Sequence, residues 1–324
     1  MVTRDDLLEN KRSSDSWYHE TSSKKSLGVL KLASEFDNLN SRNRGYLSVV
    51  VEATQHLRRM RGGSQSHLML GSDGNLWVVK FQNNPQHRRV LGNEIIATHL
   101  AAAAGLTVPQ VAAVNVSAWM IENTPELYVD IGGRKERCAA GLNFGTRFVG
   151  GLMPGHVVDD LPDEQLEKVR NVNEFIGALA FDKWTGNTDG RQAVFSRNAR
   201  ETYYTATFID HGHCFDAGAW RFEDLPLRGA YPRNLVYAGV RGWMSFEPWL
   251  TLMENMEAQK VWQVINEVPP EWINENGIQE VVAEIEILVE MLLVRRRRIR
   301  ELIINFALSD RRPFPNWLSH TNRS

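Results

Sequence analysis

Hydrophobic and polar positions in the first half of the chain alternate in short runs typical of β-strands. The runs are 46–53, 66–70, 76–81, 108–116, 118–121 and 143–149. Polar turns that contain glycine separate the first three runs, as in β-hairpins. Residues 93–104 instead have helical spacing, and Gly105 suits the position just after a helix. This half therefore predicts a small β-sheet that carries one helix.

The second half of the chain has mostly helical patterning. Residues 166–184 are apolar at the spacing of one helical face, and residues 279–306 repeat this spacing over a longer stretch. Two short strands are predicted between these helices, at 193–196 and 206–210. We expect an α+β fold of two lobes, a small β-sheet lobe and a larger helical lobe, with the boundary near residues 150–151.

Composition limits the kinds of protein that this could be. The 324 residues carry 37 Lys and Arg against 39 Asp and Glu, and this near-neutral balance argues against a protein that mainly coats nucleic acid. Two cysteines exclude a disulfide framework, and the start of the chain lacks the apolar segment of a signal peptide. Because no stretch has the length and hydropathy of a membrane span, we expect a cytoplasmic protein without a membrane partner.

The first 44 residues differ from the remainder. They are rich in Ser, Asn, Asp and Lys and have little periodicity, so we expect a flexible leader with a short helix near 27–36. The predicted organisation is a leader at 1–44, an N-terminal lobe at 45–150 and a C-terminal lobe with a helical tail at 151–324.

A turn of small residues is the first candidate functional cluster. Gly62, Gly63, Ser64, Gln65 and Ser66 lie between two predicted strands. Glycine lets the backbone approach a ligand closely, and consecutive N–H groups can bind an anion. An ordinary hairpin turn would use the same residues, so the turn alone does not identify a site.

A lysine within an apolar run is the second cluster. Lys80 lies in the 76–81 run, and a buried ammonium is costly unless a negative charge pairs with it. Glu94, on the predicted helix, could provide that charge. Protein kinases hold nucleotide phosphates with a lysine that a glutamate positions. The alternative is a lysine on an edge strand that faces solvent.

Acidic and amide side chains form two further clusters. Asp182 lies near the end of the predicted helix, Asn187, Asp189 and Gln192 follow within about ten residues, and Asp210 ends a predicted strand. Phosphoryl transfer needs a carboxylate that orients the acceptor hydroxyl and oxygen ligands that hold Mg²⁺. Helix capping and turns use the same residue types. The order of the clusters along the chain is therefore more informative than any one of them.

That order is glycine turn, strand lysine, helix glutamate, loop aspartate and strand-end aspartate, which is the order of these elements in kinases. The chain resembles the HipA-like kinases, an atypical branch of the protein-kinase-like fold, and most closely their compact, stand-alone members. The matching segments are Gly63-Ser64-Gln65, Val79-Lys80-Phe81, Gly186-Asn187-Thr188-Asp189 and Ile209-Asp210. The resemblance covers about residues 46–250 and implies a nucleotide-binding N-terminal lobe and a catalytic C-terminal lobe.

The resemblance also implies a role for single residues. Asp189 would be the catalytic base, Asp210 the Mg²⁺ ligand, Lys80 the phosphate-binding lysine and Glu94 its ion partner. The turn at 62–66 would cover the phosphates of ATP.

Two features depart from the family pattern. The family usually has Arg-His directly after the base, where this chain has Gly190-Arg191 after Asp189. It also has an asparagine five residues after the base, where this chain has Val194. Either Asn187 or Gln192 then supplies the metal-binding oxygen, or the metal site is weakened. Asp182 is a second candidate for the base, because Asp182 and Asn187 have the Asp-x4-Asn spacing of ordinary kinases.

The resemblance implies an ATP- and Mg²⁺-dependent phosphotransferase that phosphorylates Ser or Thr of a protein acceptor. Two alternatives remain open, a pseudokinase that acts by binding a nucleotide or a regulatory partner, and a kinase of a small molecule or lipid. HipA relatives often have antitoxin partners, so a partner of that kind is a further expectation from the resemblance.

Overall fold

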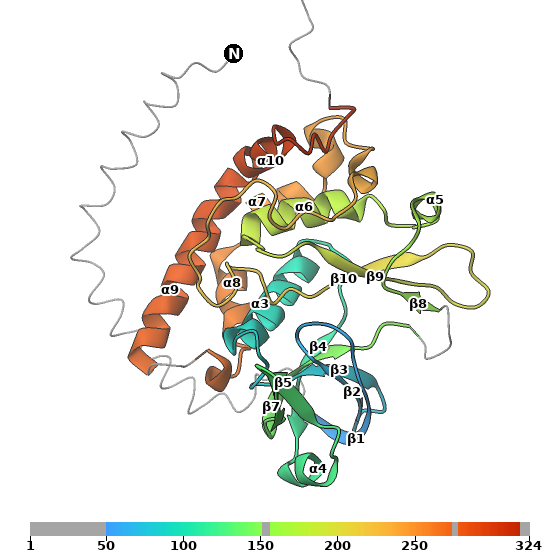
Figure 1. Cartoon of the computed structure of the whole chain (residues 1–324). Helices are drawn as coiled ribbons and strands as arrows, with labels where there is room; N and C mark the ends of the chain where they lie inside the picture. Colours follow the sequence, from blue (N-terminus) through green and yellow to red (C-terminus); the bar gives the residue numbers. More distant parts are fainter. Residues whose placement is uncertain (1–49, 151–155, 274–277, 318–324) are drawn as a thin grey trace, which may run out of the picture. The chain divides into compact units, whose positions relative to one another are not determined.

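The computed structural model of the protein describes residues 50–150, 156–273 and 278–317 (Figure 1). In its first part, five strands close into a barrel in the order β1-β2-β3-β7-β4. Neighbouring strands are antiparallel, except that β1 and β4 pair in parallel over a short stretch. Alternate side chains such as Trp77 and Val79 fill the barrel, as the period of a strand requires. The strands are β1 Val51–Arg59, β2 His67–Gly71, β3 Leu76–Lys80, β4 Val111–Val116 and β7 Gly141–Arg147.

Helix α3 (Arg89–Ala103) connects the barrel to the second part of the chain. It packs against β4 and β7 on one side and against α6 (Glu174–Thr185) and α8 (Ala258–Ile265) on the other (Figure 1). Nearly all of its first three turns are buried, including the polar side chains of Arg89, Asn93, Glu94 and Thr98. Such groups need partners inside the protein. Asn93, Glu94 and Thr98 find them in residues 211–217, whereas Arg89 pairs with Glu284.

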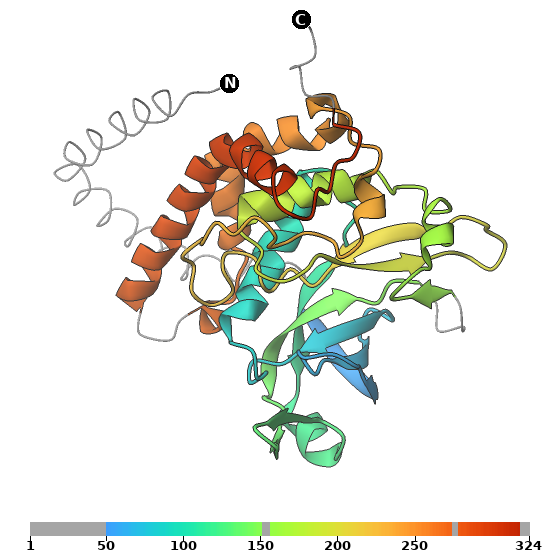
Figure 2. The ribbon, with the colours of Figure 1, turned by 45° about the horizontal axis from the view of Figure 1, so that its top comes forward.

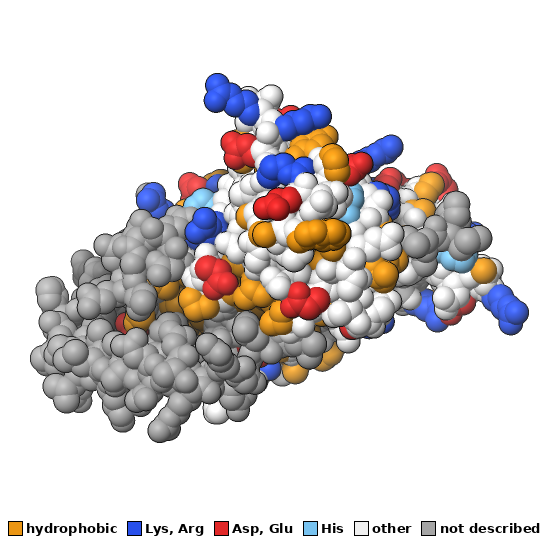
Figure 3. Space-filling view, turned by 90° about the horizontal axis from the view of Figure 1, so that it is seen from below, with side chains coloured by type: hydrophobic (Ala, Val, Ile, Leu, Met, Phe, Trp, Pro, Cys, Tyr) orange, Lys and Arg blue, Asp and Glu red, His pale blue; other side chains and the backbone are white. Residues whose placement is uncertain are grey.

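A helix and a hairpin extend the barrel. Residues 118–121 were expected to form a strand, but α4 (Ala118–Asn123) is a helix, because the Ser117 side chain accepts a hydrogen bond from the Met120 N–H at its N-terminus. Strands β5 (Tyr128–Ile131) and β6 (Arg134–Arg137) form a separate two-stranded sheet. Figure 3 shows the molecule from below, with basic, acidic and apolar side chains interspersed on this face.

The second part begins with a three-stranded sheet, in the order β10-β9-β8, and with helix α6. The single helix expected at 166–184 is wrong. Helix α6 starts only at Glu174, because residues 168–171 bond to the strand region: Arg170 N–H donates to the Tyr204 carbonyl, and the Asn171 side chain bonds to the backbone of Ala206. The elements are β8 Val157–Val158, α5 Asp163–Leu166, α6 Glu174–Thr185, β9 Gln192–Ser196 and β10 Thr205–Ile209.

Helices complete the second part, with α9 and α10 packed along α6 (Figure 2). The single helix expected at 279–306 is two helices joined by a short 3-10 turn at Arg296–Arg298. Buried Trp272 donates a hydrogen bond to the Leu142 carbonyl of β7, which ties the helices to the barrel. The helices are α7 Trp249–Glu254, α8 Ala258–Ile265, α9 Ile278–Arg295 and α10 Ile299–Ala307, with 3-10 turns at Asn234–Tyr237, Trp243–Phe246 and Pro270–Trp272.

The expected two-lobed α+β architecture is confirmed. The expected leader at 1–44 and its short helix lie outside the described residues, as does residue 151 at the expected boundary between the lobes. Among the described helices, none has the length and hydropathy needed to cross a membrane.

Candidate active site

Lys80 stands at the end of β3 with its side chain almost buried. Its ammonium contacts Glu94 Oε1 on α3 and lies 2.9 Å from Asp210 Oδ1. Burial alone would lower the pKa of Lys80, but the charges of Asp210 and Glu94 outweigh it and raise this pKa above the ordinary value. Lys80 is therefore a permanent cation between two carboxylates, and the solvent-facing edge-strand alternative is excluded.

Asp210 follows β10 directly and has a left-handed backbone, with φ of 59°. This conformation is uncommon for residues other than glycine, and it turns the chain sharply at the strand end. Burial would raise the pKa of Asp210, but the charge and hydrogen bond of Lys80 hold it below its usual range. The next residue, His211, donates its backbone N–H to Glu94 Oε2 at 2.9 Å. Glu94 thus joins the strand lysine to the segment that carries Asp210.

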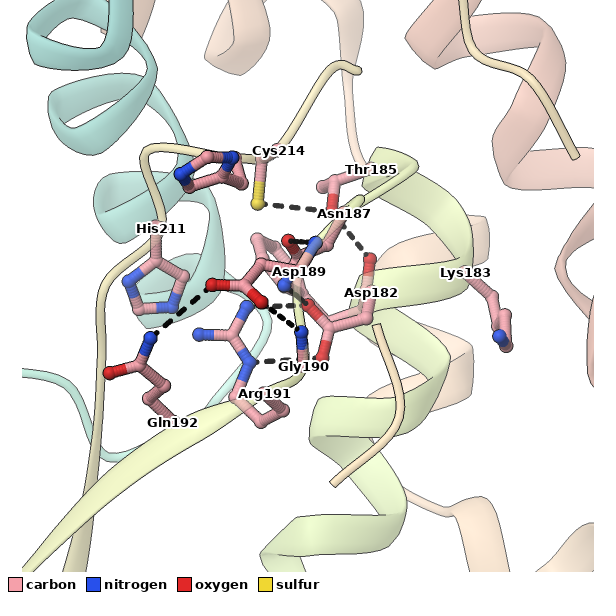
Figure 4. Close-up of polar contacts among 12 residues, drawn as sticks. Asp182, Lys183, Thr185, Asn187, Asp189, Gly190, Arg191, Gln192, His211 and Cys214 are labelled. Carbon is pink, nitrogen blue, oxygen red and sulfur yellow. Dashed lines mark hydrogen bonds and ion pairs between the residues drawn. The ribbon is translucent and has the colours of Figure 1, made fainter. Parts of the chain in front are cut away.

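The two candidate bases have opposite environments (Figure 4). The Asp182 side chain is 0% exposed and accepts hydrogen bonds from Arg191 Nε at 2.9 Å and from Asn187 Nδ2 at 3.0 Å. Asp189 is exposed, and its carboxylate accepts from the Gly190 N–H at 2.8 Å. An acceptor hydroxyl can reach Asp189, whereas Asp182 is committed to the ion pair with Arg191.

The two candidate amide ligands also differ in accessibility. Asn187 is buried, and both ends of its amide are engaged, because Nδ2 donates to Asp182 and Oδ1 accepts from the Asp189 N–H at 3.1 Å. Gln192 is exposed and pairs across the sheet with Ile209, the residue before Asp210. Its Nε2 lies 3.4 Å from Asp189 Oδ2 (Figure 4). Of the two candidate amides, Gln192 is therefore the accessible one. It lies beside Asp189 and, across the sheet, beside the residue before Asp210.

The glycine turn at 62–66 connects β1 to β2 at the barrel edge. Gly62 has φ of 121°, which favours glycine, and its carbonyl accepts from the Gln65 N–H at 3.2 Å. The Gln65 side chain bonds to the backbone of Asp130 in β5, so it supports the turn and does not face outward. A Cβ added at Gly63 would lie 3.6 Å from Gln86 Nε2, and this nitrogen lies 3.2 Å from His213 Nε2. The turn thus lies close, through Gln86, to the segment after Asp210.

Several buried residues to which the sequence assigned no role support the site. Arg191 donates to the Ile209 carbonyl at 2.9 Å in addition to its contacts with Asp182. Lys183 is buried and bonds to the carbonyls of Pro226 at 2.7 Å and Arg228 at 2.5 Å. Asn93 bonds to three carbonyls of the segment after Asp210. A polar residue inside an apolar helix was the available signal for Lys183 and Asn93, because such a residue must have a partner.

The arginine run at 295–298 also has an internal role. Arg295 is buried, donates to the Trp184 carbonyl at 2.8 Å and to the Lys183 carbonyl at 2.7 Å, and pairs with Asp224 at 2.6 Å. It therefore satisfies carbonyl groups at the end of α6, just before the candidate catalytic loop.

A β-barrel, a lysine paired with a helix glutamate and an aspartate at a strand end define a protein of the kinase-like class. Residues 53–299 match the sequence profile of the HipA-like kinases, which is most of the chain, so the protein belongs to the HipA-like kinase family. The family expected from the sequence is thereby confirmed.

The chain is similar to several solved structures, and the first of these supports the fold. The Helicobacter pylori proinflammatory kinase CtkA is 14% identical, with a TM-score of 0.51 over 81% of this chain and 100% of its own. The Golgi casein kinase with Mn/ADP bound is 11% identical, with a TM-score of 0.45 over 85% of this chain and 76% of its own. HipA of Shewanella oneidensis MR-1, solved with HipB and operator DNA, is 14% identical, with a TM-score of 0.41 over 78% of this chain and 68% of its own. No curated protein matches the chain.

Proposed function

We propose that the protein is an ATP- and divalent-metal-dependent phosphotransferase that phosphorylates a Ser or Thr hydroxyl of a protein. The observation that carries this proposal is the convergence of Lys80, Glu94 and Asp210 from three separate elements. A structural ion pair would need only one carboxylate. A lysine between two carboxylates, in a protein that also has an exposed aspartate after α6 and a glycine turn in the barrel, has the composition of a nucleotide-phosphate site.

Lys80 would bind the phosphates of ATP. An ammonium has three N–H donors, and Glu94 and Asp210 account for two of them. The third is available for a phosphate oxygen, under the turn at 62–66. The phosphates would then share the cation with Asp210.

The residues around Asp210 fit a magnesium ion. Asp210 carries an ionised carboxylate whose side chain is 22% exposed, and Gln192 offers an amide oxygen nearby. In the described part of the chain, no group of three His, Cys, Asp or Glu residues is arranged to hold a metal alone, so phosphate oxygens would have to complete the coordination. When bound, the metal would neutralise charge on the phosphates. Asn187 is less suited to this role than Gln192, because it is buried and its amide nitrogen and oxygen are both hydrogen-bonded.

Asp189 would orient the acceptor hydroxyl and accept its proton. Its carboxylate is exposed and is fixed by the Gly190 N–H, so it has both access and a defined direction. Positioned general bases of this kind contribute roughly 10²- to 10⁴-fold to rates. Asp182 would instead hold the loop through Arg191.

The first test is nucleotide binding by calorimetry, with ADP in the presence and absence of Mg²⁺. We expect the wild type to bind more tightly with Mg²⁺, and Asp210→Asn to lose this gain. The matched control is Asp159→Asn, which removes an exposed carboxylate outside the site. Absence of any nucleotide binding by a folded wild type would refute the proposed function.

The second test is phosphoryl transfer from Mg²⁺-ATP, followed by intact-mass spectrometry of the protein and by labelling of a Ser/Thr peptide library. Labelled peptides in the wild type that are absent with Asp189→Asn would support a protein kinase. Binding without transfer to protein, peptide, small-molecule or lipid acceptors would favour the pseudokinase alternative suggested by Val194.

A further inference from the structure

Asn93 precedes Glu94 on α3. Its side chain contacts the segment 212–217, which follows Asp210 in the chain. Its side chain is fully buried, and Nδ2 lies within hydrogen-bond distance of three backbone carbonyls. These belong to Gly212 at 2.9 Å, Cys214 at 3.1 Å and Ala217 at 2.7 Å. One amide nitrogen therefore contacts the backbone at three points across residues 212–217.

The orientation of this amide is fixed from the other side. Trp220 donates its indole N–H to Asn93 Oδ1 at 3.0 Å, so the nitrogen must face the carbonyls. An amide nitrogen has only two hydrogens, and the three carbonyls share them. Removal of the nitrogen would leave the buried Gly212 and Cys214 carbonyls and the partly buried Ala217 carbonyl without this donor, which is unfavourable.

The gathered segment has an irregular backbone that would not hold its shape alone. Phe215, Asp216 and Ala217 all have positive φ, at 61°, 60° and 53°. Such conformations are costly for residues other than glycine and persist only where the surroundings impose them. Asn93 supplies part of that constraint, through Ala217 on one side and Gly212 on the other.

The segment begins two residues after Asp210. Glu94 Oε2 accepts the His211 N–H, and Asn93 donates to the carbonyl of the next residue, Gly212. Consecutive residues of α3 thus hold consecutive residues of the chain that leaves Asp210. The helix that positions Lys80 through Glu94 also fixes the backbone on which Asp210 depends.

We propose that Asn93 is a positioning residue for Asp210, which couples helix α3 to the metal-dependent part of nucleotide binding. This inference rests on the proposed function. It predicts that loss of the Asn93 amide nitrogen weakens the binding of magnesium nucleotide and leaves metal-free nucleotide binding nearly unchanged. A residue needed only for stability would lower both to the same extent, or neither.

The experiment compares Asn93→Asp with Asn143→Asp. Asn143 is a matched control, because it is also fully buried and its Nδ2 donates to two carbonyls, those of Ala139 at 3.1 Å and Gly141 at 2.9 Å, within the barrel. We expect both variants to lower the Tm. Only Asn93→Asp should lower the affinity for Mg²⁺-ADP roughly tenfold, the size of about one lost hydrogen bond, with less than a twofold change for ADP alone.

Hydrogen exchange provides a second measurement on the same proteins. Amide exchange across 212–217 should become faster in Asn93→Asp and stay unchanged in Asn143→Asp. If Asn93→Asp does not fold, Asn93→Ser, which keeps a small hydroxyl donor, takes its place in both measurements.

The outcomes separate the two proposals. A wild type that does not bind Mg²⁺-ADP refutes the proposed function, and this inference with it. A wild type that binds, together with equal losses of Mg²⁺-ADP affinity in the Asn93 and Asn143 variants, refutes the positioning role alone. Unchanged exchange across 212–217 in the Asn93 variant also refutes it.

Discussion

Replacement of Lys80 with methionine would leave two carboxylates facing each other without their shared cation. Glu94 is 2% exposed and Asp210 is 22% exposed, so water can screen this repulsion only weakly. Removal of one partner from a buried ion pair typically costs about 3–5 kcal/mol, because the remaining charge is desolvated and unpaired. We expect Lys80→Met to lose about that much free energy of unfolding at pH 8.

The loss should become smaller as the pH falls. Burial raises the pKa of Glu94, and Lys80 opposes this shift in the wild type. Without Lys80 the pKa of Glu94 rises further, so the folded variant takes up a proton that the unfolded chain does not. Each unit of difference between the folded and unfolded pKa is worth about 1.4 kcal/mol, and the folded variant regains this stability as the pH falls from 8 to 5.

Urea unfolding of both proteins at pH 8, 6.5 and 5 measures the effect. The control is Lys80→Met combined with Glu94→Gln, in which the pH dependence of the deficit should largely disappear, because glutamine does not titrate. A deficit below about 1 kcal/mol that is the same at pH 8 and pH 5 would refute the description of Lys80 as a cation between buried carboxylates.

Three further predictions follow from burial and pairing. Asp189→Asn should lower phosphoryl transfer roughly 10²- to 10⁴-fold with little change in stability. Asp182→Asn should instead lower the free energy of unfolding in urea by about 3–5 kcal/mol. The reverse pattern would mean that Asp182 is the base and Asp189 the structural residue. Burial raises the pKa of the Cys138 and Cys214 thiols to about 12, so iodoacetamide at pH 8 should modify them slowly in the native protein and fully after unfolding, and rapid native labelling seen by mass spectrometry would contradict this. Burial lowers the pKa of Lys183 to about 8, so the free energy of unfolding should rise with pH between 8 and 10.5. Urea unfolding at pH 7.5 and 9.5 measures this rise, and Lys183→Met should remove it. A rise that is unchanged in the variant would contradict the lowered pKa of Lys183.

The fold was predictable wherever local pattern and final environment agree. The strand around Lys80 and the strands at 193–196 and 206–210 lie close to their expected places, because alternation and length identify them. Residues 166–173 were wrongly predicted to be helical. Val169 and Val172 have helical spacing, but the Arg170 N–H and the Lys168 carbonyl on either side of Val169 bond to the backbone of Tyr204 instead. Tertiary hydrogen bonds of this kind are not encoded in periodicity.

The candidate site was predictable as a set of residue types but not as a geometry. Lys80, Glu94 and Asp210 do meet, which the residue types suggested and the structure shows by distance. The sequence could not separate Asp189 from Asp182, because the difference is the pairing of Asp182 with Arg191, a contact across nine residues. A polar residue in an apolar helix marks Asn93 as needing a partner, but the partners could not be predicted, since its three acceptors lie more than a hundred residues away along the chain.

Arg191 links the two segments that carry Asp189 and Asp210. It holds Asp182 at the end of α6 with one part of its guanidinium and the Ile209 carbonyl of β10 with another. The loop with Asp189 and the strand with Asp210 are thereby fastened to a single block. Relative motion of the barrel and this block would change the distance from Lys80 to Asp210 and leave the spacing of the two aspartates constant. If the protein acts as proposed, the distance between the base Asp189 and the metal ligand Asp210 would therefore stay fixed while the position of Lys80 changes.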